Sequence, residues 1–290
     1  MYMEKTTHPF LQLLIMFALT LGMLAVGSVL MFVAAALGVD VLSSSNMLVF
    51  QAISQLLMFV VPVVLVVLIY HRHEARPFLR LDFSRRPWLM ALAGLAVWVL
   101  LMPLMDWCTV WNDSWHFSAP FEPLEKMLRE IGEHTKAVME TMLAGAGVGT
   151  LLANLVVIAL VPAVCEEFFF RAGMQNLMLR WVKNPHVAIW VTAAVFSLFH
   201  GEVFAFMPRF IMGAILGYLY LGSNSIVPNM VAHFFNNAMV VVLYWLIARG
   251  VLDVDPEAPM AAAWPITLGC TVAAVAVAYV SFGKNLKISR

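Results

Sequence analysis

The stretch that decides the fold is VGTLLANLVVIALVPAVCEEFFF, residues 148–170, a nearly unbroken apolar run that ends in two adjacent glutamates. A helix of about 20 residues crosses a hydrocarbon layer roughly 30 Å thick, and similar runs recur along the chain. The 290 residues are 62% hydrophobic and 12% charged, whereas soluble domains carry roughly 25% charged residues. The runs are continuous rather than alternating, which disfavours a membrane β-barrel. The sequence therefore predicts an all-α, polytopic membrane protein.

These runs predict about eight transmembrane helices in a single membrane domain covering residues 1–290. The expected spans are 9–37, 47–70, 87–105, 148–170, 186–202, 206–222, 226–248 and 262–282. The apolar core of a signal peptide is only about 7–15 residues long, so the first span is expected to remain as an uncleaved helix. The three cysteines lie far apart without a CxxC pair, which indicates neither a disulfide framework nor a cysteine metal site.

The distribution of Lys and Arg predicts that both termini are cytoplasmic. With the N-terminus inside, the inside loops contain the basic residues of 72–86, 171–183 and 284–290, and the outside loops contain far fewer. The first span has no targeting extension ahead of it, which favours the inner membrane of a bacterium. The formal net charge is zero, so no global field would attract nucleic acid. The lipid bilayer is the expected surrounding.

One long extramembrane stretch, residues 106–149, separates the third and fourth spans. Apolar residues recur at helical spacing near 121–144 with charges between them, a pattern typical of an amphipathic helix that lies on the membrane surface. We expect an anchoring or packing element on the outer face, with a substrate gate as the alternative.

Four ionisable residues lie at membrane depth: Glu166, Glu167, His200 and His233. Such residues face the bundle interior and are functional candidates, and together they would satisfy one another's polar needs. At about 1.5 Å per residue, Glu166 and His200 lie roughly 25 and 23 Å from the turn at 183–185, hence at matching depth. His233 should lie shallower, unless the inner end of its span is recessed or the expected boundary is misplaced.

Residues four apart share a helix face, and three such pairs occur here. Glu167 and Arg171 should form a bidentate ion pair, which leaves Glu166, about 100° around the helix, free to face elsewhere. The other two pairs are His233 with Asn237 and Phe196 with His200.

The chemistry of this set favours direct attack of water on a carbonyl, since no serine or cysteine nucleophile accompanies it. Glu166 with His200 could deprotonate the water, and His233 with Asn237 could donate hydrogen bonds to an oxyanion. Taken alone, each histidine would be an interhelical contact and Glu167–Arg171 a structural pair. Their conjunction indicates a site.

EEFFFR (166–171), FSLFH (196–200) and HFFNN (233–237) resemble, in order, the EExxxR, FxxxH and HxxxN motifs of the CPBP family, the CAAX prenyl protease and bacteriocin-processing (Abi-like) intramembrane proteases. The resembling core covers about 150–245. The resemblance implies an endopeptidase in which Glu166 and His200 activate water, His233 and Asn237 form the oxyanion site, and Glu167 with Arg171 is structural. Asn236 falls outside the motif spacing, so a packing role is expected.

The family is often labelled metalloprotease, and a zinc ion would be held by Glu166, His200 and His233, a His₂Glu set. Because HExxH is absent and Asn237 suits an oxyanion site, we expect no metal or other cofactor.

The resemblance offers three substrate classes: prenylated CAAX C-termini, bacteriocin leader peptides and other membrane-associated proteins. Prenylated substrates are not expected in bacteria. Two other functions stay open: a proton- or cation-coupled transporter, and a non-catalytic membrane scaffold or immunity protein. Outside the motifs, Gly213 and Gly217 form a GxxxG expected to pack helices closely, and Glu202 with Arg209 is expected at the interface, paired.

Overall fold

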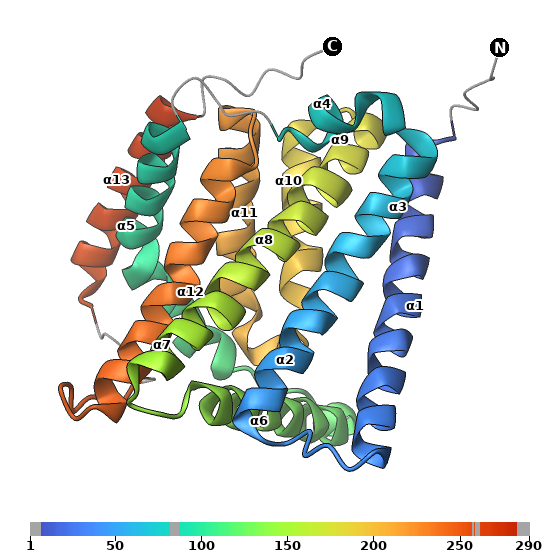
Figure 1. Ribbon diagram of the computed structural model, residues 1–290. Coiled ribbons are helices and arrows are strands. Elements are labelled where there is room, and N and C mark those ends of the chain that lie inside the picture. The colour runs from blue at the N-terminus through green and yellow to red at the C-terminus, as the bar shows by residue number, and fades with distance from the viewer. Residues whose placement is uncertain (1–6, 82–86, 257, 259–261, 283–290) are drawn as a thin grey trace.

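A computed structural model describes residues 7–81, 87–256, 258 and 262–282, and within these ranges the chain is a bundle of helices without strands (Figure 1). The predicted polytopic helical class is confirmed. The chain is an integral membrane protein, because seven of the described helices are long and apolar enough to cross a bilayer.

Seven of the predicted spans form, but the third continues from residue 105 to Asp113, into the stretch predicted to lie outside the membrane, and the fourth continues from residue 170 to Val182. The observed spans are Pro9–Ala36 (α1), Ser44–Tyr70 (α2, η1 and α3), Pro87–Asp113 (α5), Val148–Val182 (α7 to α9), Val203–Ser223 (η6 and α11), Val227–Ala248 (α12) and Trp264–Ser281 (α13).

The eighth predicted span, 186–202, is longer than the helix that forms there. This helix, α10, covers Pro185–Leu198, only 14 residues. It ends early because the chain turns through Gly201, whose φ of +72° lies in the left-handed region that favours glycine. His200 therefore lies in the turn after α10 rather than within a helix.

Two spans contain π-helical turns just before a proline. In the second span, α2 (Ser44–Gln55) passes through η1 (Leu56–Val60) into α3 (Val61–Tyr70), which holds Pro62. In the fourth, α7 (Val148–Asn154) passes through η4 (Leu155–Leu160) into α8 (Val161–Glu167), which holds Pro162. A proline cannot donate to the carbonyl four residues earlier, and its ring crowds that carbonyl. The wider π-helical turn accommodates both effects.

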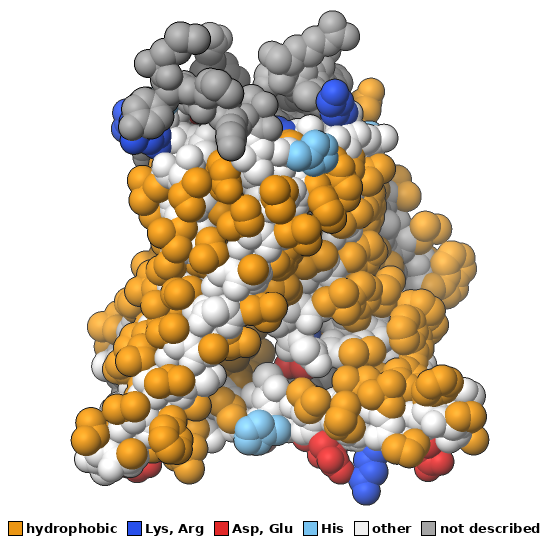
Figure 2. All heavy atoms as spheres, turned by 90° about the vertical axis from the view of Figure 1, so that its right-hand side faces the viewer, with side chains coloured by type: hydrophobic (Ala, Val, Ile, Leu, Met, Phe, Trp, Pro, Cys, Tyr) orange, Lys and Arg blue, Asp and Glu red, His pale blue; other side chains and the backbone are white. Residues whose placement is uncertain are grey.

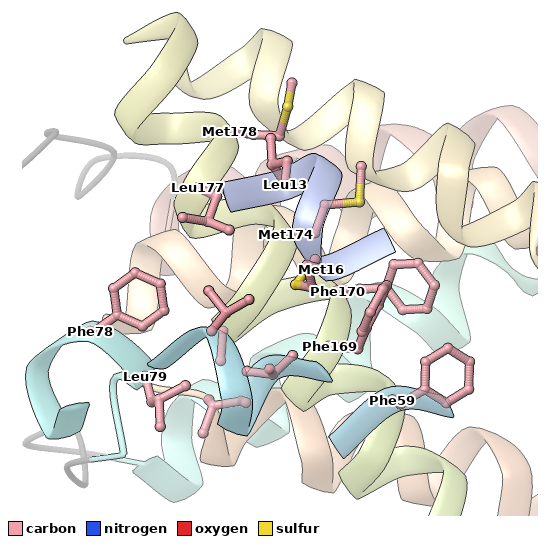
Figure 3. Close-up of a cluster of buried hydrophobic side chains, with 14 of the residues drawn as sticks. Leu13, Met16, Phe59, Phe78, Leu79, Phe169, Phe170, Met174, Leu177 and Met178 are labelled. Atoms are coloured by element: carbon pink, nitrogen blue, oxygen red, sulfur yellow. The ribbon is translucent and has the colours of Figure 1, made fainter. Parts of the chain in front are cut away.

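The fourth span continues as one helix through η5 (Phe168–Gln175) and α9 (Asn176–Val182). Its middle packs against α1, η1, α3 and the short α4 (Ala75–Leu79). At Gly173 an added Cβ would lie 2.9 Å from Val63 Cγ2 and 3.1 Å from Met16 Sδ, so only glycine allows this approach. The resulting core, drawn in Figure 3, contains Leu13, Met16, Phe59, Phe78, Leu79, Phe169, Phe170, Met174, Leu177 and Met178.

Basic residues lie at one side of the bundle, and the amphipathic helix lies at the opposite side. The start of α1, α4, the end of α9 and the end of α13 lie at one side of the bundle (Figure 1). These segments and their flanks hold the described basic residues of the predicted inside loops: Arg72, Arg76, Arg80, Arg180 and Lys183. Arg171 was wrongly counted among them, because its side chain is fully buried in the bundle. Arg85, Arg86, Lys284, Lys287 and Arg290 lie outside the described residues.

The predicted amphipathic helix forms as α6, Glu122–Leu143, and lies across the opposite side of the bundle (Figure 1). Its first turns are held by Glu125, which accepts hydrogen bonds from the Phe117 backbone N–H at 2.6 Å and from Arg129 Nε at 3.0 Å, and pairs with His116 Nδ1 at 2.9 Å. The Phe117 N–H foremost, together with Arg129 and His116, lowers the pKa of Glu125 to about 2.

This lowered pKa predicts that the attachment of α6 weakens in acid. The ordinary pKa of Glu is about 4.3, so the stabilisation by Glu125 is complete above that pH and is lost as the pH falls toward 2. The hydrogen-exchange protection factors of α6, which correct each rate for the intrinsic pH dependence of amide exchange, should therefore fall between pH 4.5 and 2.5. In Glu125→Gln, the protection factors should already be low at pH 6 and change little with acid. Equal pH dependence in both proteins would contradict the role of Glu125.

Candidate active site

Glu166 and Glu167 lie at the end of α8 and are 7% and 0% exposed. Glu167 is the centre of a polar cluster that joins three helices. Its Oε2 lies 3.3 Å from Arg171 Nε and accepts a hydrogen bond from Asn229 Nδ2 at 3.1 Å, while its Oε1 lies 3.0 Å from His233 Nδ1. Glu167 thus contacts a guanidinium and an imidazole at once, and every charge in the cluster has a neighbour of opposite sign or a polar partner.

The prediction of a bidentate contact between Glu167 and Arg171 is wrong. Arg171 approaches Glu167 through Nε alone, while its Nη2 donates to the carbonyl of Gly213 at 3.3 Å. The reason is local: Arg171 lies within the π-helical η5, whose wider turn alters the α-helical register on which the expectation rested. The second oxygen of Glu167 is thereby left for His233.

Gly213 and Gly217 confirm the expected close packing of α11 (Phe206–Ser223). An added Cβ would lie 3.0 Å from Ala193 Cα at Gly213 and 2.8 Å from Ile189 Cγ2 at Gly217, so α10 and α11 could not pack as they do with larger residues. Their carbonyls also accept hydrogen bonds one helical turn apart, from Arg171 at 3.3 Å and from Gln175 at 3.0 Å. The GxxxG therefore also holds the helix that carries the glutamates.

Glu166 faces away from Arg171 and toward two other helices. Its Oε2 lies 3.9 Å from His233 Nε2, and its Oε1 accepts a hydrogen bond from Gln55 Nε2 at 3.3 Å. His233 is therefore at the depth of the glutamates rather than shallower. The inner end of its span is recessed: Ser225 and Ile226 are fully buried, and the Ile226 N–H donates to the Arg80 carbonyl.

Phe196 brings the three motif segments together. Its ring centroid lies 4.9 Å from that of His200 and 6.0 Å from that of His233, and Arg171 Cζ lies 5.1 Å from the same centroid. The sequence indicated Phe196 only as the partner of His200. In the structure its ring packs against the imidazoles of His200 and His233 and the guanidinium of Arg171.

Hydrogen bonds fix the protonated nitrogen of each imidazole. A carboxylate and a carbonyl only accept, so His233 donates through Nδ1 to Glu167, and His200 donates through Nδ1 to the Phe196 carbonyl at 2.9 Å. When neutral, each ring then has an unprotonated Nε2. His233 donates through Nε2 only as an imidazolium, and Glu166 and Glu167 flank this ring with the opposite charge.

Asn237 lies one turn beyond His233 on α12 (Val227–Ala248). Within the described chain, no hydrogen bond joins it to Glu166, His200 or His233; its Oδ1 instead accepts from Asn236 Nδ2 at 2.9 Å. That bond leaves the Asn237 amide hydrogens free to donate. Asn236 also lines a small cavity of about 10 Å³ beside His233. The expected packing role of Asn236 was therefore incomplete, since it also orients Asn237.

Two polar partners of the glutamates, Asn229 and Gln55, were missed by the sequence reasoning. Asn229 had a signal: with His233 and Asn237 it forms a polar stripe at spacing four on an otherwise apolar helix. Gln55 had only its position inside a long apolar run. The expected pairing of Glu202 with Arg209 is confirmed, through a short contact with Arg209 Nη2.

The zinc alternative would require Glu166, His200 and His233 to converge on one ion. Among the described residues, no three or more His, Cys, Asp or Glu side chains are grouped so that they could hold a metal ion. The three cysteines are free and separate, as expected.

Residues 148–239 match a protein-family model described as "Type II CAAX prenyl endopeptidase Rce1-like". The matched region begins with α7 and ends within α12, so it contains all three motifs. No curated protein and no solved structure matches the chain.

Proposed function

Because residues 148–239 match the family model of type II CAAX prenyl endopeptidases, Rce1-like, we propose that this chain is an intramembrane endopeptidase that hydrolyses a peptide bond in a membrane-associated protein or peptide. The observation that carries this proposal is Glu166. Its carboxylate is only 7% exposed, and its Oε2 lies 3.9 Å from His233 Nε2. Arg171 pairs with Glu167 instead, so Glu166 is not part of that ion pair.

In the proposed reaction Glu166, assisted by His200, takes a proton from a water molecule whose oxygen attacks the peptide carbonyl carbon. The electron pair of the C=O bond moves to the oxygen, and His233 as an imidazolium, together with the Asn237 amide, stabilises that oxyanion. When the C–N bond breaks, Glu166 returns the proton to the leaving amine. Glu167 holds the proton on His233 Nδ1 and thereby directs Nε2 toward the reaction.

We propose that this reaction needs no metal. The neutral imidazoles do have a free Nε2, and each donates through Nδ1 to an oxygen, an arrangement also found behind zinc ligands. The described side chains nevertheless do not gather into a metal-binding set. The amide of Asn237 supports an oxyanion site instead.

The role of Asn237 predicts a large kinetic effect of a small substitution. Asn237→Ala should lower kcat about 10²–10³-fold, the usual loss for one oxyanion donor. Asn237→Asp should lose as much, because it puts an acceptor where a donor is required. Asn236→Ala should lose less, since it only frees the Asn237 side chain to rotate. An Asn237→Asp protein with near-normal kcat would exclude the donor role.

The proposal is tested by comparing peptide termini across the host membrane proteome with wild-type protein and with Glu166→Gln at equal abundance. A protease should generate a set of new termini that are lost in Glu166→Gln. If the termini are unchanged while proton or cation flux across vesicles depends on Glu166, the transporter alternative replaces the proposal. The termini found would also distinguish prenylated, leader-peptide and other membrane substrates.

A further inference from the structure

Gln55 lies outside the matched family region and is the one buried residue of α2. It is 7% exposed and comes directly before the π-helical η1. Its Nε2 donates to Glu166 Oε1 at 3.3 Å across 111 positions of sequence. A side chain from the N-terminal part of the chain therefore contacts the residue proposed as the base.

The two carboxylate oxygens of Glu166 contact residues on two different helices. Gln55 on α2 binds Oε1, and His233 on α12 lies beside Oε2. A carboxylate fixed on both sides cannot rotate freely, and a base must keep its accepting oxygen within hydrogen-bond reach of the proton it takes. Without Gln55, only the contact of 3.9 Å with His233 would orient the group.

The amide of Gln55 also has a free acceptor at the site. Since a carboxylate only accepts, Nε2 rather than Oε1 must face Glu166. Gln55 Oε1 is then buried, and no described residue donates a hydrogen bond to it. An acceptor in this position, beside the base, suits the second hydrogen of a water molecule whose first hydrogen points at Glu166.

Aromatic packing makes the position of Gln55 rigid. Phe59, one turn further along η1, packs against three rings, with centroids 5.3 Å from Phe169, 5.7 Å from Phe170 and 6.2 Å from Phe199. The first two lie two and three residues after Glu167, and Phe199 precedes His200. The same contacts thus join α2 and η1 to the segments that carry Glu166 and His200.

We propose that Gln55 is a positioning residue for hydrolysis: its Nε2 orients Glu166, and its Oε1 accepts a hydrogen bond from the water that Glu166 deprotonates. The proposal rests on the proposed protease function. Water gives one proton to Glu166 and keeps the other, which remains on the attacking oxygen while bonded to Gln55, so Gln55 itself gains and loses no proton.

Because the matched family model describes a CAAX prenyl endopeptidase, the kinetic test uses the full chain in proteoliposomes with an internally quenched farnesylated peptide that ends in a CAAX sequence. Gln55→Leu should lower kcat roughly 10- to 100-fold, the scale of a misplaced reacting group, with little change in KM. Gln51→Leu is the matched control, one turn earlier on the same helix, and should leave kcat unchanged. In a Glu166→Asp background, whose shorter side chain cannot reach Gln55, only the contact of Gln55 with the water remains, so Gln55→Leu should lower kcat less than it does in the wild-type background.

An infrared measurement tests the contact without any substrate. The carboxylate band of Glu166 is assigned as the band that disappears in Glu166→Gln, and Gln55→Leu should shift it whereas Gln51→Leu should not. An unshifted band, or an equal loss of kcat in the wild-type and Glu166→Asp backgrounds, overturns the proposal for Gln55. If no variant or wild-type protein cleaves the peptide, that outcome counts against the proposed function for this substrate, and the infrared result still decides on Gln55.

Discussion

Glu167→Gln is expected to lower the free energy of unfolding by about 3–5 kcal/mol, the range found when one partner of a buried ion pair is removed. Arg171 and Glu167 are both 0% exposed. The substitution would leave the guanidinium charge in the bundle interior in contact with neutral acceptors, the Gly213 carbonyl and the new amide oxygen, in place of a carboxylate. Unfolding by heat or by SDS in mild detergent measures the loss.

A double variant separates the two roles of Glu167. Glu167→Gln with Arg171→Met removes both charges, so most of the lost stability should return. The activity should not return, because His233 Nδ1 would then face an amide instead of the carboxylate that now lies 3.0 Å away. A double variant that is both stable and fully active would show that Glu167 is only a structural brace. A loss of stability below about 1 kcal/mol in Glu167→Gln would contradict the buried-charge argument.

Glu166→Gln is expected to lower kcat about 10²–10⁴-fold, the usual contribution of a general base. The amide has nearly the same size but cannot take a proton, so folding and KM should change little. Glu166→Asp should retain part of the activity, since it remains a base at a longer distance. The quenched peptide in proteoliposomes measures all three proteins.

A chelator in the same assay distinguishes the two mechanisms. Metal-independent hydrolysis predicts that 1,10-phenanthroline leaves kcat of the wild type unchanged and that the purified active protein contains no stoichiometric zinc. Inhibition that added zinc reverses would replace the proposed mechanism by a metal-dependent one. Glu166→Gln with wild-type kcat would exclude Glu166 as the base under either mechanism.

The spans could be predicted because lipid demands about 20 apolar residues for each crossing. Helix ends and helix type could not be predicted as well. The predicted span 186–202 was extended through His200, Gly201 and Glu202, whereas α10 ends at Leu198, just before these residues. The π-helical turns leave no periodic signal in a uniformly apolar run, and only Pro62 and Pro162 hint at them.

The ionisable residues of the candidate site could be predicted from the sequence, whereas two of its neutral polar residues were missed. Glu166, Glu167, His200 and His233 stand out because charge is rare at membrane depth. Gln55 and Asn229 carry no charge and are therefore less conspicuous, although both contact a glutamate. The direction of each hydrogen bond depends on how helices distant in sequence pack, as for Asn236 and Asn237, and spacing alone cannot supply it.

The short α10 also has a consequence for the surrounding lipid. Its 14 residues cover only about 21 Å at a rise of 1.5 Å per residue, against a hydrocarbon layer of roughly 30 Å. Val187, Trp190, Val191 and Leu198 on its surface are exposed and face the bilayer. Such a hydrophobic mismatch is relieved by local thinning of the leaflet, and the ion pair of Glu202 with Arg209 follows directly where α10 ends. Figure 2 shows a hollow in an otherwise apolar face, and acidic side-chain atoms are visible within it. We expect a bilayer that thins beside α10 to bring water closer to the depth of Glu166 than an undisturbed membrane would.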